Sequence, residues 1–131
     1  MAIMVYNEGR TLRFAFGKEA FVKNSQEIMK EFAREVGRIL GDSLSKIILY
    51  GSYARGDYHD GSDMDLMILT NLTDDEIEKA ERKLFDLAFD FQMKYYVDIS
   101  VILKNEAHFR YWLGALPFYD NVEKEGVVLY G

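Results

Sequence analysis

Several residues in the middle of the chain carry groups that can bind phosphate. Gly51-Ser52 follows a short apolar run, so the backbone there can approach a ligand without an intervening Cβ, and it offers N–H groups and a hydroxyl. Arg55 carries a fixed positive charge that can meet phosphate oxygens. Asp63 and Asp65 are two residues apart at the start of a predicted strand, so we expect both carboxylates on one face of a sheet.

Carboxylates held together in this way predict a divalent cation. Two such groups repel each other, and a bound cation is the usual relief. Asp98 lies within an otherwise apolar segment, residues 97–103, where an unpaired charge is costly. If that strand neighbours the one at Asp65, three carboxylates converge on a point that can hold two metal ions for in-line phosphoryl chemistry. Oxygen ligands without cysteine favour Mg²⁺ or Mn²⁺ over zinc.

Two other ion-binding or phosphate-binding loops are excluded. Counting an EF-hand from Asp63 puts Met67 at the third ligand and Ile68 where glycine belongs. No Gly-Lys-Ser/Thr follows Gly51, so the segment is no Walker P-loop. A solvated loop charge remains the alternative for Arg55, because arginines in loops usually face solvent.

The elements that position these residues follow from apolar periodicity and capping signals. Helices are expected from Asn24 or Ser25 to Gly41 and from the Thr73 capping box to about Met93. A last helix is expected to end at Pro117 and to place apolar side chains in the core, namely Phe109, Trp112, Leu113 and Leu116. Strands are expected at residues 46–50, 66–69, 97–103 and 127–130, and a hairpin within residues 1–20 with its turn at Asn7-Glu8-Gly9. The order predicts an α/β (α+β) fold with a small mixed sheet flanked by helices.

A second apolar stripe on the Thr73 helix has two interpretations. Phe85, Phe89 and Met93 are four apart and lie well round from the predicted core face. Either the helix is sandwiched and both faces are buried, or the stripe is an exposed surface for a partner protein. Three acidic neighbours would suit a basic partner, namely Glu78, Asp86 and Asp90.

Composition narrows the class of protein. The chain has 131 residues, 49% of them apolar, which fits one domain over residues 1–131. It has no cysteine, no apolar run long enough to span a membrane and no signal-like N-terminus, so we expect a cytoplasmic protein without membrane contact. With 16 Lys+Arg against 22 Asp+Glu the net charge is −6, which argues against direct nucleic-acid binding.

The complete pattern resembles a known superfamily. Gly51-Ser52, followed by Asp63-x-Asp65 and a later Asp98, is similar to the nucleotidyltransferases typified by DNA polymerase beta. The spelling Gly-Ser-x-Ala-Arg-Gly…Ser-Asp-x-Asp-Leu resembles their minimal single-domain branch, MNT, which is often the antitoxin partner of a HEPN-domain ribonuclease toxin. The likeness covers a catalytic core at residues 44–103, and the segment from Glu125 to Tyr130 also resembles the end of these proteins.

The resemblance implies a polymerase-beta-like fold and a role for each motif residue. Asp63 and Asp65 would hold two Mg²⁺ ions, and Asp98 would bind the catalytic ion and help to deprotonate the attacking hydroxyl. Gly51 and Ser52 would contact the triphosphate, with Arg55 assisting. The reaction would move AMP from ATP to a hydroxyl and release pyrophosphate.

Three hypotheses remain for the target. Only 28 residues follow Leu103, which is short for an acceptor-binding domain, so another chain is expected to present the hydroxyl. The first hypothesis is a protein adenylyltransferase antitoxin acting on a HEPN toxin. The second is a binding module that blocks its partner by occlusion. The third is transfer to a small molecule, as in aminoglycoside nucleotidyltransferases, with a homo-oligomer supplying the acceptor site.

Overall fold

The computed structural model describes residues 2–7, 11–16, 19–59 and 61–131, with side chains from residue 24 onward. The strands are β1 Ala2–Asn7, β2 Thr11–Phe16, β3 Glu19–Lys23, β4 Leu44–Tyr50, β5 Met64–Thr70, β6 Ile99–Asn105 and β7 Val127–Tyr130. The helices are α1 Ser25–Leu40, the 3₁₀ turn η2 Gly41–Ser43, α2 Ser52–Arg55, α3 Asp74–Tyr95, α4 Glu106–Trp112 and α5 Pro117–Glu125.

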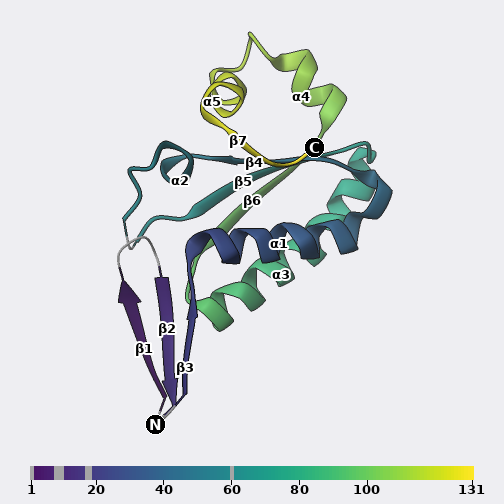
Figure 1. The fold of residues 1–131 in the computed structure, drawn as a ribbon. Coiled ribbons are helices and arrows are strands. Elements are labelled where there is room, and N and C mark those ends of the chain that lie inside the picture. The colour runs from purple at the N-terminus through teal and green to yellow at the C-terminus, as the bar shows by residue number, and fades with distance from the viewer. Residues whose placement is uncertain (1, 8–10, 17–18, 60) are drawn as a thin grey trace.

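A four-stranded mixed sheet lies at the centre of the fold, in the order β6-β5-β4-β7 (Figure 1). β5 pairs with β6 in parallel, whereas β4 pairs antiparallel with both β5 and β7. The predicted α/β class with a small mixed sheet is confirmed. The parallel pair is the important one for the site, because it brings the starts of β5 and β6 together.

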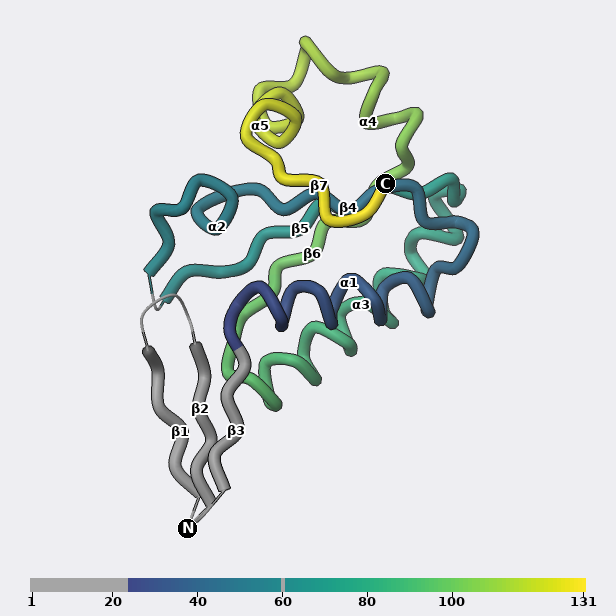
Figure 2. The backbone as a smooth tube through the Cα atoms, in the orientation of Figure 1, coloured from purple at the N-terminus to yellow at the C-terminus, as the bar shows by residue number. Residues whose placement is uncertain are grey.

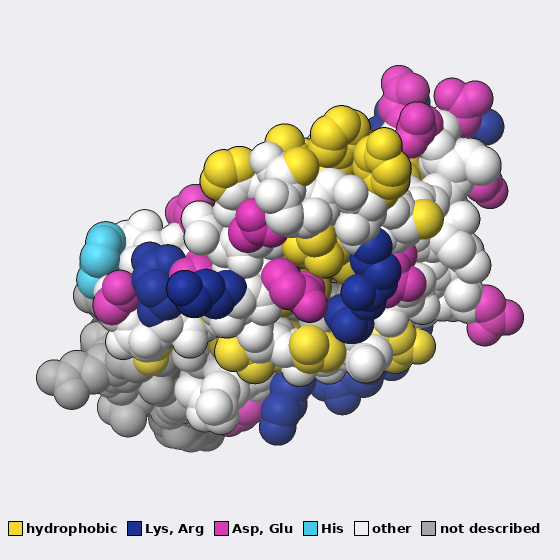
Figure 3. All heavy atoms as spheres, turned by 90° about the horizontal axis from the view of Figure 1, so that it is seen from above, with side chains coloured by type: hydrophobic (Ala, Val, Ile, Leu, Met, Phe, Trp, Pro, Cys, Tyr) yellow, Lys and Arg dark blue, Asp and Glu magenta, His cyan; other side chains and the backbone are white. Residues whose placement is uncertain are grey.

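Each face of this sheet is covered by helices. α1 and α3 pack on one face, where Phe32 and Phe91 meet edge to face with ring centroids 5.1 Å apart. α4 and α5 cover the other face, where Phe109 and Tyr119 pack with Met67 of β5. Seen from above, hydrophobic side chains also gather on the outside of the molecule (Figure 3).

The two long helices begin where capping predicts. The Asn24 side chain accepts a hydrogen bond from the Glu27 N–H at the start of α1. At α3 the capping box is complete, since the Thr73 hydroxyl accepts from the Glu76 N–H and the Glu76 carboxylate accepts from the Thr73 N–H. α3 extends to Tyr95, slightly beyond the expected end near Met93.

The prediction around Pro117 is wrong. Instead of ending a helix, Pro117 is the first residue of α5, and the preceding α4 already ends at Trp112. Proline suits both places, because the first helical position needs no N–H donor. With the helix broken there, only Phe109 of the expected core residues is fully buried, while Trp112 and Leu116 are each 38% exposed.

The buried interpretation of the second apolar stripe on α3 is also wrong. Phe85, Phe89 and Met93 are 51%, 59% and 63% exposed. The core face of α3 is made by other residues, including Ile77, Leu84, Phe91 and Tyr95. The helix is therefore covered on one face only, within the described part of the chain.

The N-terminal hairpin is confirmed and is larger than expected. β1 and β2 pair antiparallel from Ala2↔Phe16 to Asn7↔Thr11, and β3 adds a third antiparallel strand that the sequence analysis missed. The expected turn at Asn7-Glu8-Gly9 lies mostly outside the described residues.

The expected C-terminal edge strand is confirmed as β7. It runs along β4 and ends with Gly131 beside the backbone of Ser45 and Lys46 (Figure 2). The pairing Leu49↔Val127 fixes where α5 ends, just above the end of β4. None of the helices in the described part of the chain combines the length and apolar character needed to cross a bilayer.

Candidate active site

The phosphate-binding candidate is a tight turn after β4. Gly51 has φ 75° and ψ −155°, and its carbonyl accepts hydrogen bonds from the N–H groups of Ala54 and Arg55 in the short α2. Gly56, at φ 85° and ψ 8°, ends that turn. A positive φ is costly for residues other than glycine, so both glycines are required by the backbone.

Asp65 packs directly against this turn. It is opposite Tyr50 in the β4–β5 register, and a Cβ on Gly51 would overlap the Asp65 carboxylate. Burial, followed by the nearby charge of Asp63, raises the pKa of the Asp65 carboxyl, while Arg55 opposes the shift. Burial and the Asp65 charge also raise the pKa of Tyr50 to about 12. Negative charge is thus concentrated at the end of β4 and the start of β5.

The two aspartates that flank Met64 have different environments. Met64 is fully buried, whereas Asp63 is exposed and Asp65 is half-buried. Since Asp63 contributes to the raised pKa of Asp65, the two carboxylates act on one another across the buried methionine. This agrees with side chains two residues apart sharing a side of a strand.

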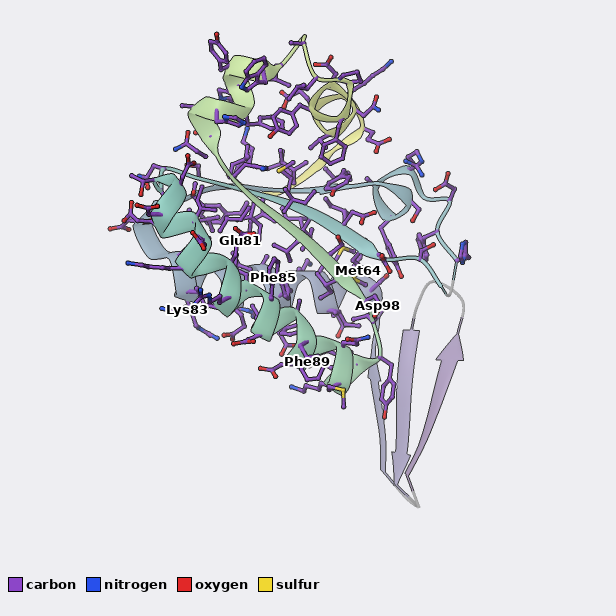
Figure 4. All side chains as sticks on the ribbon, turned by 180° about the vertical axis from the view of Figure 1, so that it is seen from behind. Met64, Glu81, Lys83, Phe85, Phe89 and Asp98 are labelled. Atoms are coloured by element: carbon purple, nitrogen blue, oxygen red, sulfur yellow. The ribbon has the colours of Figure 1, made fainter. Side chains whose placement is uncertain are left out.

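Asp98 comes immediately before the neighbouring strand β6 and so differs from its predicted position. It precedes β6 instead of lying inside it, and its side chain is exposed. The Met64 N–H donates to the Asp98 carbonyl at 2.8 Å, so Asp98 is beside the Asp63–Asp65 pair in the parallel register (Figure 4). The argument that a buried charge needs a cation is therefore wrong for Asp98, because solvent reaches its carboxylate.

The three predicted carboxylates do not form a ready metal cluster. Among the described residues, no group of three His, Cys, Asp or Glu side chains is close enough to hold an ion. The Asp98 carboxylate instead accepts a hydrogen bond from the Gln92 side chain of α3 at 2.7 Å. The oxygen donors fit Mg²⁺ or Mn²⁺ in kind, and the second oxygen of the Asp98 carboxylate can still accept while the first is bonded to Gln92.

Arg55 is held at the site by two carboxylates. It donates to Asp57 at 3.2 Å and to both oxygens of Glu125 at 3.1 and 3.3 Å. The bonds to Asp57 first, and then to Glu125, raise the pKa of the Arg55 guanidinium. Arg55 is nevertheless exposed, so a phosphate could reach it.

Glu125 is the site residue that the sequence analysis missed. Its carboxylate also accepts a hydrogen bond from the Gly51 N–H at 3.0 Å, so it sits on the turn proposed for phosphate. The β4–β7 register explains this contact, since the pairing of Leu49 with Val127 places residue 125 opposite Gly51. Gly126 permits the close approach, because a Cβ there would overlap the Ile48 side chain and the Val122 carbonyl.

Comparison with known protein families identifies the family of this chain. A family model described as "Nucleotidyltransferase domain" matches residues 29–129, which contain the turn, all three aspartates and Glu125. This chain belongs to the nucleotidyltransferase domain family. The nucleotidyltransferase match begins within α1, so β1, β2 and β3 lie outside it.

Two proteins of Methanocaldococcus jannaschii are similar to this nucleotidyltransferase, and each is named a "Putative protein adenylyltransferase". One is 38% identical over 101 residues, covering 77% of this chain and 94% of the relative. The other is 36% identical over 107 residues, covering 82% of this chain and 99% of the relative. Family and relatives together make this chain an enzyme of nucleotidyl transfer.

A solved structure shares the fold of this nucleotidyltransferase. It is described as a toxin–antitoxin with AMP-PNP, is 21% identical, and has a TM-score of 0.50 over 78% of this chain and 73% of that chain. At this level of identity the likeness concerns the fold alone.

Proposed function

We propose that this nucleotidyltransferase transfers AMP from ATP to a hydroxyl group of a partner protein, and that the partner is a HEPN-domain toxin. The observation that carries the proposal is the Asp65 carboxylate packed on the Gly51 turn, with Asp63 close enough to raise its pKa. Relatives named protein adenylyltransferases support a protein acceptor. A similar fold in a toxin–antitoxin with AMP-PNP supports ATP and a toxin partner.

The reaction would proceed in line at the α-phosphorus of ATP. The acceptor oxygen forms a bond to that phosphorus, and the bond to the pyrophosphate oxygen breaks. The proton of the attacking hydroxyl would pass to the Asp98 carboxylate, which is exposed at the start of β6 and within reach of solvent. Pyrophosphate leaves with the electron pair of the broken bond.

Asp63, Asp65 and Asp98 are the residues that would hold two Mg²⁺ ions, or Mn²⁺ in their place. Bound there, a divalent cation would neutralise charge on the triphosphate and lower the pKa of the attacking hydroxyl. Burial and then the charge of Asp63 raise the pKa of Asp65, and a cation would relieve the repulsion between the two carboxylates.

The turn residues would bind the phosphates. The Gly51 N–H now donates to Glu125, so a phosphate oxygen would take the place of that carboxylate oxygen. Ser52 adds a hydroxyl at the first position of α2. Arg55, already placed by Asp57 and Glu125, would exchange a carboxylate partner for a phosphate.

Replacing Arg55 with alanine should raise KM for ATP about tenfold, because the variant loses a charge-assisted hydrogen bond to phosphate. Steady-state kinetics with ATP as the varied substrate measures this. Arg38→Ala is the matched control, since Arg38 is exposed on α1 and bonded to Glu35. An unchanged KM in Arg55→Ala would make Arg55 a solvated loop charge, the alternative left open by the sequence.

The apolar surface of α3 favours a second candidate, inhibition of the toxin by occlusion without catalysis. A ribonuclease assay separates the two. The HEPN-domain protein is incubated with wild type or Asp65→Ala, with and without ATP and Mg²⁺, and RNA cleavage is followed. Adenylyl transfer predicts inhibition that needs both ATP and Asp65. Equal inhibition by Asp65→Ala without ATP would replace our proposal with occlusion.

A further inference from the structure

The outward face of α3 carries an apolar row, which we call the outer stripe: Phe85, Phe89 and Met93. Tyr96 follows directly after the last residue of the helix. Spacings of four residues place the three stripe residues on one side of the helix. Each side chain is half or more exposed. In Figure 4, Phe85 and Phe89 follow one another along α3 toward the end of the helix nearest Asp98. Exposed apolar residues scattered singly are ordinary, whereas a row of three large ones on one helix face marks an interaction surface.

The outer stripe does not belong to the hydrophobic core. The opposite side of α3 already packs on α1 and the sheet, with Leu84 fully buried and Phe91 in edge-to-face contact with Phe32. Tyr95 is also buried there and donates from its hydroxyl to Glu31 of α1 at 2.8 Å. Within the described part of the chain, Phe85, Phe89 and Met93 are thus left exposed, and a partner molecule could cover them.

The outer stripe leads into the candidate active site. A hollow of about 390 Å³ is lined by Phe89, Gln92, Met93, Tyr96 and Asp98. Gln92 lines this hollow beside Phe89 and Met93, and its side chain donates a hydrogen bond to the Asp98 carboxylate, the proposed proton acceptor. Whatever binds the stripe near Tyr96 is next to the group that would deprotonate the acceptor hydroxyl.

Charge beside the outer stripe indicates the chemistry of the occupant. The adjacent row on α3 consists of Glu78, Arg82, Asp86 and Asp90, all exposed. Three of these four charges are negative. A partner with basic residues flanking its apolar side chains complements that row, and it would be steered to this face more strongly at low salt.

The geometry points to the outer stripe as the docking surface for the acceptor polypeptide itself. Resting on the proposed function, this inference assigns the stripe to a segment with apolar side chains flanked by Lys or Arg, whose hydroxyl residue enters the hollow at Asp98. Docking there and phosphate binding at the Gly51 turn use different elements, α3 and the β4–α2 turn. Acceptor affinity and ATP affinity should therefore respond to different substitutions.

The test is a kinetic comparison of Phe89→Ser with Tyr111→Ser, using the HEPN-domain protein as acceptor and ATP with Mg²⁺. Phe89→Ser should raise KM for the acceptor about tenfold or more, as expected when a central aromatic contact is lost, and leave KM for ATP unchanged. Tyr111 is the matched control, because it is an exposed aromatic residue on α4, across the sheet from α3. Asp90→Lys should likewise raise KM for the acceptor and reduce its dependence on salt.

The outcomes are distinguishable. If wild type transfers AMP and Phe89→Ser keeps the wild-type KM for the acceptor, the docking surface is wrong and the proposed function stands. A parallel rise in KM with Tyr111→Ser would also overturn it, since the effect would not be specific to the stripe. If wild type transfers no AMP to this acceptor, the proposed function and the docking surface both fail.

Discussion

Replacing Asp65 by asparagine should lower AMP transfer about 10³-fold or more, as is typical when a group central to the chemistry is removed. The same substitution should raise the free energy of unfolding at neutral pH. The carboxylate is half-buried and its pKa is raised by burial and by Asp63, so its ionised form destabilises the folded state. Transfer assays and urea denaturation of the same preparations measure the two effects.

The pH dependence of this stability difference has a defined sign. Because the folded state raises the pKa of Asp65 above its ordinary value of 3.8, protonated Asp65 stabilises the fold below that value, and this stability is lost as pH rises through the folded pKa. Asparagine imitates the neutral form, so the variant should gain on wild type as pH rises from acid to neutral. Asp42→Asn, an exposed carboxylate before β4 and away from the site, should show neither effect.

Added Mg²⁺ should reverse that ranking if the aspartates hold the ion. At a free concentration of about 100 times Kd, binding to the folded state alone would add about 2.7 kcal/mol to wild type. The Asp65→Asn variant should gain much less. Equal stabilisation of both proteins would contradict a role for Asp65 as a metal ligand.

Replacing Gly51 by alanine should cost about 3 kcal/mol or more of unfolding free energy and abolish transfer. Two costs combine, because the backbone conformation at φ 75° is restricted to glycine and the new Cβ would overlap the Asp65 carboxylate. Thermal or urea denaturation measures the first loss, and the transfer assay measures the second.

Gly56→Ala is the matched control for Gly51→Ala. Gly56 also has a positive φ, 85°, but a Cβ there would meet nothing within 4 Å. It should cost only about 1–2 kcal/mol, the penalty for a left-handed conformation alone. Equal losses in the two variants would show that Asp65 does not press on the turn.

Local signals in the sequence predicted the elements that carry the site. Asn24 and Thr73 begin their helices as their capping chemistry requires, and the apolar run before Gly51 is β4. Pro117 failed as a signal, because proline fits both after a helix and at its first position. Periodicity could not predict whether Phe85 and Phe89 are exposed, because it shows that a helix face is apolar but not what covers that face.

The sequence motif indicated which residues belong to the candidate site, but it indicated less of how their side chains are arranged. Spacing alone placed Asp63 and Asp65 beside each other, and parallel pairing brings Asp98 next to them. Whether Asp98 turns toward that pair or toward Gln92 depends on a side-chain contact with α3 that no local pattern encodes. Glu125 reaches Gly51 only because β7 pairs with β4, a long-range register.

The most direct test of AMP transfer uses ATP labelled on either the α- or the γ-phosphate, with Mg²⁺ and the HEPN-domain protein as acceptor. Wild type should place the α-label on the acceptor and leave the γ-label in released pyrophosphate, and Asp63→Ala should transfer neither. Transfer of the γ-label would show a kinase instead. Absence of α-label from the acceptor with folded wild-type protein would contradict the account.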